Sequence, residues 1–260
     1  MRLKDKVVVI TGATKGLGRE IAFALGEEGA RLVLSGRNMS DLESVASEIR
    51  ADGLDPLIVR ADLTKPGDVE ALANAALQSA EGRVDVLVNA AGIAARNPRP
   101  IWEQTEEDFR AFFDTNVMGA FLTMKFIIPI MIKQRSGKIV NIGGTFGHKG
   151  VEGVSLYGSS KWALRGLTKS VALEAGRYGI NVNCIAPGGI QGPSFESWLC
   201  DEAERLDFPL EEMRSRFLSR TALRRMSTNR NIADVVIFLA SEESALITGQ
   251  DLPVDGGTIV

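Results

Sequence analysis

The chain has few of the residues that stabilise secreted proteins or bind metals and nucleic acids. Its 260 residues include two cysteines, Cys184 and Cys200, and a single histidine. So few cysteines argue against a disulfide scaffold and a metal site, and they favour a reduced, cytoplasmic protein. The formal net charge of −3 provides no basic surface for nucleic acid or anionic lipid. We therefore expect neither of them as a partner.

Long apolar runs are also missing. The longest apolar stretch, "AFLTMKFIIPIMI", contains Lys125 and Pro129, and we expect it to be too short and too interrupted to span a bilayer. The first residues, "MRLKDKVVVITG", reach a strand pattern within six positions, which leaves no room for a signal peptide. These features predict a soluble protein that does not enter a membrane.

What the sequence does contain is a regular alternation of short apolar runs and helical patterns. The runs lack the period-two alternation of half-exposed strands, so they are typical of parallel strands buried on both faces. They occupy residues 7–10, 31–35, 56–61, 84–89, 137–142, 180–185 and 251–254, and helical patterns cover 18–29, 41–53, 66–80 and 102–134. This alternation predicts one α/β domain over residues 1–260, a Rossmann-type doubly wound parallel sheet with flanking helices.

Residues 189–226 interrupt this alternation. They contain two amphipathic segments, "SWLCDEAERL" and "EEMRSRFLSR", with no strand between them. A long insertion after the carboxyl end of a strand lies over the ligand crevice in this architecture, so we expect a substrate lid. A surface helical hairpin or a subunit contact is the alternative.

A glycine-rich loop, "TGATKGLG", directly follows the first strand and opens a helix. Gly12 allows the tight turn, Gly16 lets the backbone approach a diphosphate, and Gly18 allows close packing of helix on strand. The N-terminus of the helix then offers unpaired N–H groups to an anion. This context predicts a dinucleotide site.

The end of the second strand indicates which dinucleotide binds. The strand ends in "LSGRN", so Gly36 and Arg37 stand where an acidic residue would bind the adenosine ribose of NAD. A guanidinium at this place can bind a 2′-phosphate, and Lys15 in the glycine loop adds a second cation. The sequence therefore favours NADP(H), without excluding NAD(H).

Seven motifs in order give the chain a family resemblance. They are "TGATKGLG", "ADL", "NAAG", "TNVMGAF", "YGSSK", "NVNCIAPG" and "ITGQDLPVDGG". With them the chain resembles the short-chain dehydrogenase/reductase (SDR) family, and within it the 3-oxoacyl-carrier-protein reductase-like and the sugar- or polyol-oxidising members.

The resemblance implies roles for individual residues. Asp62 would bind the adenine, Asn89 would brace the sheet, and Asn116 would distort its helix within a proton relay. The cofactor-binding residues implied in this way are Gly12, Thr14, Lys15, Gly16, Leu17, Gly18, Arg37, Asp62, Leu63, Asn89, Ala91, Gly92, Tyr157, Lys161, Pro187, Gly188 and Ile190. Helices near 102–134 and 155–178 would pair between subunits, which implies a homotetramer or a homodimer.

Tyr157 and Lys161 form the expected catalytic pair. Four residues apart on a helix, their side chains share one face. A phenol with a pKa of about 10 is a poor base at neutral pH, but a nearby ammonium favours the phenolate. Tyr157 would exchange a proton with the substrate oxygen, and Lys161 would also hold the nicotinamide ribose. The partner is a small carbonyl or alcohol substrate, and hydride transfer is the work of the cofactor.

The sequence departs from the family pattern at Gly144. The family places a serine 13 residues before the tyrosine, where it polarises the substrate oxygen, and this chain has glycine there. Losing one such donor costs about 10²–10³ in rate. Three explanations are open: Thr145 replaces the hydroxyl, water or a polar group of the substrate does so, or dehydrogenase activity is weak or absent.

Two further features lie near the expected nicotinamide site. Gly192 stands where the family often has a threonine, and Ser194 could serve after a small shift. His148 follows the glycine pair, either to touch substrate or as an exposed loop residue beside Lys149. A binding protein without catalysis is the main alternative to an oxidoreductase, and a double-bond reductase, isomerase or dehydratase on the same fold is the third class.

Overall fold

The apolar runs of the sequence form a seven-stranded sheet in the computed structural model of the chain, which describes residues 1–79 and 82–260. Every pair of neighbouring strands is parallel, in the order β3-β2-β1-β4-β5-β6-β7. The strands are β1 Val7–Thr11, β2 Arg31–Gly36, β3 Leu57–Arg60, β4 Val86–Asn89, β5 Gly137–Ile142, β6 Ile180–Pro187 and β7 Asp251–Val254. All seven expected strands, and the α/β fold class, are confirmed.

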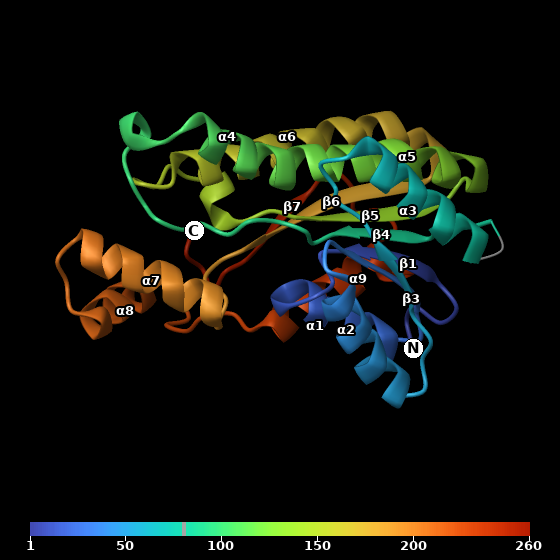
Figure 1. Cartoon of the computed structure of the whole chain (residues 1–260), viewed down its shortest axis with the longest axis horizontal. Coiled ribbons are helices and arrows are strands. Elements are labelled where there is room, and N and C mark those ends of the chain that lie inside the picture. The colour runs from blue at the N-terminus through green and yellow to red at the C-terminus, as the bar shows by residue number, and fades with distance from the viewer. Residues whose placement is uncertain (80–81) are drawn as a thin grey trace.

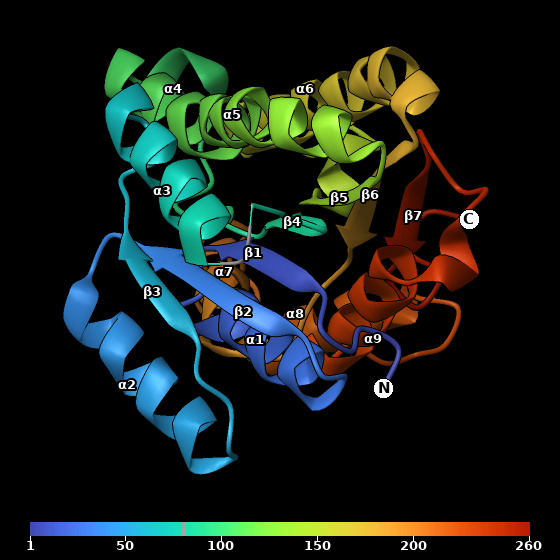
Figure 2. The same ribbon diagram turned by 90° about the vertical axis from the view of Figure 1, so that its right-hand side faces the viewer.

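The central strands carry apolar residues on both faces because helices cover both faces. All residues of β1 and β5 are buried, and Val8 of β1 pairs with Leu32 of β2 and with Val86 of β4. One hydrophobic core lies between the sheet and α1, α2 and α9, and a second core lies between the sheet and α3, α5 and α6. Figure 1 shows these two helical layers below and above the sheet, and Figure 2 shows them from the side.

The predicted helices around the sheet begin and end within a few residues of the predicted places, whereas α9 was not predicted. Their bounds are α1 Gly16–Glu27, α2 Met39–Ala51, α3 Pro66–Ser79, α4 Glu106–Phe113, α5 Gly119–Gln134, α6 Ser155–Ala175 and α9 Asn229–Ala240. The predicted end of the third helix, at residue 80, lies outside the described residues. The cap of α2 is typical: the side chain of Asn38 accepts hydrogen bonds from the first turn.

The strand order places a crevice between β1 and β4. The chain winds from β1 outward to β3 and then returns to β4 on the other side of β1, so the connections after β1 and β4 diverge at the carboxyl edge of the sheet. The two connections touch there, since the N–H of Ala91 donates to Thr11 Oγ1 at 3.3 Å. Ligands of open parallel sheets bind at such a switch point.

The apolar stretch around Pro129 lies in one long helix, close to the predicted range 102–134. A capping box between Thr105 and Asp108 starts α4, and a π-helical turn, Asp114–Met118, joins α4 to α5 without a break. The resulting helix of 29 residues, Glu106–Gln134, is long and apolar enough to cross a membrane by length and composition. About 44% of its apolar window is buried within the protein, where α5 packs on α3, α6 and the sheet.

Residues 189–226 form a small unit beyond the carboxyl ends of the strands. Two helices, α7 (Pro193–Arg205) and α8 (Leu210–Ser219), pack on each other around Leu199, Ala203 and Met213. Figure 1 shows this pair projecting from the left end of the molecule, on the side to which β6 leads. The predicted pair of amphipathic helices is thus present where a lid would lie.

Candidate functional site

At two of its glycines, the loop after β1 is packed so tightly that the backbone has no room for a side chain. A Cβ on Gly18 would lie 2.1 Å from the carbonyl oxygen of Gly12, and a Cβ on Gly12 would lie 2.6 Å from Cα of Ala91. Gly12 also has a φ of +70°, which favours glycine. Gly16 has open space beside it, at the N-terminus of α1.

The start of α1 suits a diphosphate. Among the described residues no side chain caps this helix, and its first turn contains no acidic residue. Its N–H groups and the positive end of its dipole are therefore available to an anion. Thr14 packs close by, since a Cβ on Gly36 would lie 2.6 Å from its methyl group, and Leu17 packs against the core below. The residues present fit a dinucleotide.

Two cations and one carboxylate lie at the adenosine end of this crevice. Arg37 and Lys15 are exposed, and neither forms an ion pair within the described part of the chain. Partial burial raises the pKa of Asp62, but hydrogen bonds from the backbone and hydroxyl of Thr64 outweigh it and lower the pKa below its usual value. Asp62 is thus held ionised beside the crevice, and the neighbouring Leu63 packs against Gly119 of α5.

Tyr157 and Lys161 lie on one face of α6, as their spacing predicts. Lys161 is buried, its Nζ donates to the carbonyl oxygen of Ile142 at 3.0 Å, and it lies 5.7 Å from the centre of the Tyr157 ring. Gly92, after β4, is close to the same ammonium, because a Cβ there would lie 3.6 Å from Nζ. The pair therefore faces the crevice in which a nicotinamide ribose would lie.

Burial shifts the pKa values of both groups. It raises the pKa of Tyr157 to about 12 and lowers the pKa of Lys161 to about 8. At neutral pH the phenol is protonated and the ammonium is still mainly charged. This combination suits a proton donor whose developing negative charge is stabilised by a neighbouring cation.

Asn116 lies in the π-helical turn, and both its side-chain oxygen and its side-chain nitrogen form hydrogen bonds. Its Oδ1 accepts from the N–H of Ile93 at 2.8 Å, and its Nδ2 donates to Ser160 Oγ at 3.0 Å. Ser160 lies between Tyr157 and Lys161 in sequence, so Asn116 ties the connection after β4 to the helix that carries the pair. Such π-helical turns occur frequently at functional sites.

Asn89 belongs to a buried polar network under the same site. It donates to Asn141 Oδ1 at 2.8 Å and accepts from Thr123 Oγ1 at 2.7 Å, which links β4, β5 and α5. Asn141 continues the network to Thr168 on α6 at 2.9 Å. A fully satisfied network of this kind fixes the relative positions of strands and helices.

The two glycines before Thr145 have different reasons to be glycine. A Cβ on Gly143 would lie 2.7 Å from Cys184 Sγ, whereas a Cβ on Gly144 would lie 3.0 Å from the Tyr157 hydroxyl oxygen. Position 144 thus faces the phenol directly. Thr145 is buried beside it, but its hydroxyl makes no hydrogen bond to Tyr157 or to any other described residue.

The connection after β6 forms the other wall of the crevice. The N–H of Gly188 donates to Val254 on β7 at 3.2 Å, and a Cβ on Gly188 would lie 2.7 Å from that of Asp255. Pro187 ends β6, and Ile190 forms a bridge to Ser227. Gly192 precedes α7, and Ser194 in the first turn of α7 is exposed.

His148 is not the exposed loop residue that the sequence suggested. Its side chain is 15% exposed, and its Nε2 lies 2.7 Å from Asp251 Oδ2, which also lies 2.8 Å from Arg165 Nε. Arg165 and Asp251 form a salt bridge and His148 contacts the same carboxylate, although neither N–H group is aligned well enough for a hydrogen bond. Asp251 therefore joins β7 to α6 and to the loop that carries Thr145.

The sequence analysis missed this cluster, although a signal was present. Asp251 is a charged residue at the start of a predicted strand, and Arg165 lies one turn after Lys161 on the same helix. The cluster also contributes to raising the pKa of Cys184, after burial itself, so that thiol is protonated. Within residues 1–79 and 82–260, no group of three or more potential metal ligands comes together.

Comparison with known proteins identifies the family of the chain, and the similarity extends over its whole length. Residues 6–202 match the family model described as short chain dehydrogenase. The 3-oxoacyl-[acyl-carrier-protein] reductase of Thermotoga maritima is 35% identical over 264 aligned positions, with both chains fully covered.

Two solved structures extend this similarity. NAD+-bound xylitol dehydrogenase superimposes with a TM-score of 0.94 at 29% identity, covering 99% of this chain and 100% of the other. An actinorhodin polyketide ketoreductase with NADPH superimposes with a TM-score of 0.91 at 32% identity, covering 98% of each chain. These are oxidoreductases that use nicotinamide cofactors, and the protein belongs to the short-chain dehydrogenase family.

Proposed function

We propose that the protein is an NADP(H)-dependent oxidoreductase that interconverts a carbonyl group and a secondary alcohol. The observation that carries this proposal is the pair of the partly buried Tyr157 and the buried Lys161, which faces the glycine-lined crevice at the carboxyl edge of the sheet. A bound nicotinamide would supply or accept the hydride. The residues of the chain then have to bind, orient and exchange one proton.

Tyr157 donates its phenolic proton to the carbonyl oxygen during reduction. Burial keeps the phenol protonated at neutral pH, with its pKa raised to about 12. Lys161 stabilises the phenolate that forms, and Asn116 holds the helix segment through Ser160. Because the resting phenol is neutral, it is in the protonation state that the reduction step requires.

For the cofactor, NADP(H) is preferred over NAD(H) in this proposal. Exposed Arg37 and Lys15 without ion-pair partners among the described residues, and the absence of a carboxylate at the end of β2, support it. The names of the related structures support either choice, since one contains NAD+ and the other NADPH. Arg37 is therefore the residue on which the preference depends.

A second candidate follows from Gly144. Position 144 has no hydroxyl. Among the described residues, this leaves the phenol of Tyr157 as the proton donor that the geometry supports beside the substrate oxygen. If the substrate supplies no second donor, the protein is a nucleotide-binding member with weak or lost dehydrogenase activity. Retention of Tyr157, Lys161 and Asn116 supports the enzyme instead.

We also infer a homotetramer or homodimer of a cytoplasmic protein. Large apolar side chains are exposed along one side of the molecule, on α4, α5 and α6 and the turn before α4. They include Ile101, Trp102, Phe109, Met118, Phe121, Trp162 and Leu173. Exposed apolar surface of this kind marks contacts with other chains.

The test is consumption of NADPH by the purified protein with a panel of ketones, aldehydes, ketosugars and acyl thioesters. The proposal expects turnover with at least one class and tighter binding of NADPH than of NADH. Tight binding of NADPH with no turnover across the panel would favour the second candidate.

A further inference from the structure

An aromatic wall leads from the catalytic tyrosine to the helical pair α7–α8. We use this name for Phe112, Phe146, Phe195, Trp198 and Phe217. Phe112 and Phe146 contact Tyr157 edge-on, with ring centroids 6.1 Å and 6.0 Å away. The ring of Trp198 lies 6.0 Å from that of Phe146, so the contacts run continuously from α6 to α7.

The far end of the wall reaches the other side of the crevice. The ring of Phe217 lies 6.1 Å from Trp198 and 4.8 Å from Phe195. Both phenylalanines press on Gly189, since a Cβ there would lie 2.7 Å from Phe217 and 2.9 Å from Phe195. Gly189 follows Gly188 in the connection that would line the nicotinamide, so rings border the place of the reacting carbon on two sides.

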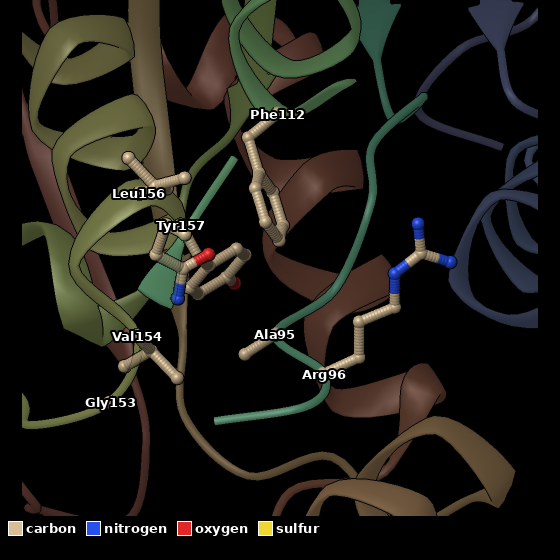
Figure 3. A pocket seen from close by; sticks show the side chains of 8 residues that line it. Ala95, Arg96, Phe112, Gly153, Val154, Leu156 and Tyr157 are labelled. Carbon is tan, nitrogen blue, oxygen red and sulfur yellow. The ribbon is translucent and has the colours of Figure 1, made fainter. Parts of the chain in front are cut away.

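The space beside Tyr157 offers few polar groups to a substrate. A small pocket there is lined by the apolar side chains of Ala95, Phe112, Val154 and Leu156, together with Arg96, Gln104 and Tyr157. Of its polar side chains other than Tyr157, Gln104 already donates to the carbonyl oxygen of Arg99 at 3.0 Å. Figure 3 shows the rings of Phe112 and Tyr157 converging on this space, while Arg96 extends away from the tyrosine.

The absence of hydroxyls at positions 144 and 192 also reduces the number of polar groups available to a substrate. Positions 144 and 192 are both glycine, so neither supplies a donor near the substrate. Besides Tyr157, a sugar or polyol bound here would find the Thr145 hydroxyl and the Trp198 Nε1, which is unpartnered among the described residues, and each further hydroxyl left without a partner would cost about 1–3 kcal/mol. A ring with one carbonyl oxygen loses nothing in the same place, because its faces and edges pack on aromatic side chains.

We infer that the substrate is an apolar cyclic or aryl carbonyl compound, held with its ring against Phe146 and Trp198 and its oxygen at Tyr157. This inference rests on the proposed function. The two aromatic side chains act as specificity determinants, and Tyr157 remains the proton donor. Linear polyhydroxy ketones and acyl thioesters are poor substrates on this account.

The experiment compares kcat/KM with NADPH for cyclohexanone and acetophenone against ribulose and an acetoacetyl thioester. The ring compounds should exceed both others by about tenfold or more. Phe146→Leu and Trp198→Leu should each lower kcat/KM for acetophenone by about tenfold, mainly through KM, as expected for lost ring contacts. Phe23→Leu on α1, far from the wall, is the matched control and should change nothing.

Higher efficiency with ribulose or the thioester, or wall variants that behave like the control, would overturn the inference. If no compound is turned over, binding of acetophenone to the NADPH complex tests the substrate class separately from the proposed function. Saturable binding that Phe146→Leu weakens would support the substrate class while the proposed function fails. Absence of binding as well as turnover would overturn the inference too.

Discussion

The glycine loop, where a diphosphate would lie, and the Tyr157 side of the crevice, where a nicotinamide would lie, are built from different parts of the chain. At the phosphate end, backbone packs against backbone: Gly12 against Ala91, and Gly18 against Gly12. At the nicotinamide end, side chains form the surface, from Tyr157 and Lys161 to the aromatic wall.

This difference separates positions that can be substituted from positions that have to be glycine. A side chain at Gly18 would meet a carbonyl oxygen at 2.1 Å, so the backbone of the phosphate end leaves no alternative to glycine. At the nicotinamide end the neighbours are side chains that can shift or be exchanged. We therefore expect cofactor binding to persist while substrate choice and rate depend on a few side chains, and the following predictions address the two ends separately.

Reversing the charge at Arg37 should have the largest effect on cofactor choice. Arg37→Asp removes the guanidinium that would bind a 2′-phosphate and introduces a carboxylate that repels it. The ratio of NADPH to NADH affinity should fall about 100-fold, measured by titrating each cofactor into the protein. Arg50→Asp on α2, where Arg50 pairs with Glu43 and Asp55, should leave the ratio unchanged. An unchanged ratio in Arg37→Asp would remove the basis for NADP(H).

Breaking the buried contacts of Asp251 should come next. Asp251→Asn leaves Arg165 without its carboxylate, and Arg165 is only partly exposed, so the free energy of unfolding should fall by about 2 kcal/mol. For a chain of this length, Tm should drop by about 5 °C, as a thermal melt would show. Asp234→Asn is the control, since its ion pair with Arg230 is exposed and should matter little. Equal melting temperatures for both variants would assign Asp251 no part in joining β7 to α6.

Restoring a hydroxyl at position 144 should raise the rate. Gly144→Ser places an additional donor beside the phenol, and we expect about a tenfold gain in kcat. The gain is smaller than the usual value of such a donor because the new Cβ would lie only 3.0 Å from the Tyr157 hydroxyl oxygen. Gly143→Ser is the matched neighbour, and it should lose stability against Cys184 without any gain in rate. A fall in kcat for Gly144→Ser would show that the phenol needs the space that glycine leaves.

The pH dependence should show the smallest effect. Burial lowers the pKa of Lys161 to about 8, so its charge is present below pH 8 and is lost as the pH rises. For the reduction reaction, kcat/KM for NADPH should be level below pH 7 and should halve near pH 8. Tyr157 stays protonated over this range because its pKa is about 12. A profile that stays level to pH 10 would separate activity from the Lys161 charge.

The sequence predicted the fold and the cofactor end more completely than the substrate end. Burial on both faces leaves an uninterrupted apolar run in each strand, and the glycine loop is a local pattern, so both can be read without coordinates. Asp251, His148 and Arg165 come from three distant elements, and only the folded chain brings them together. The aromatic wall has the same origin, since Phe146 follows β5 while Trp198 and Phe217 lie on α7 and α8.

The role of Thr145 shows a different limit. Its position next to Gly144 made it a candidate for the missing hydroxyl, yet Thr145 begins the 3-10 helix Thr145–Gly147 and does not continue the extended backbone of Gly144. Gly144 is extended, with φ of 167° and ψ of 152°, and its missing side chain would face the phenol. Sequence proximity alone does not distinguish these directions, and Thr145 remains a candidate without a hydrogen bond to Tyr157.

The central claim is that Tyr157 exchanges the proton while the rest of the crevice holds the cofactor. The direct measurement is NADPH oxidation by the wild-type protein and Tyr157→Phe with the best ketone found, together with NADPH binding to the same samples. We predict that the variant loses at least about 10³-fold in kcat and binds NADPH as tightly as the wild type. Turnover by Tyr157→Phe within about tenfold of the wild type would contradict the account.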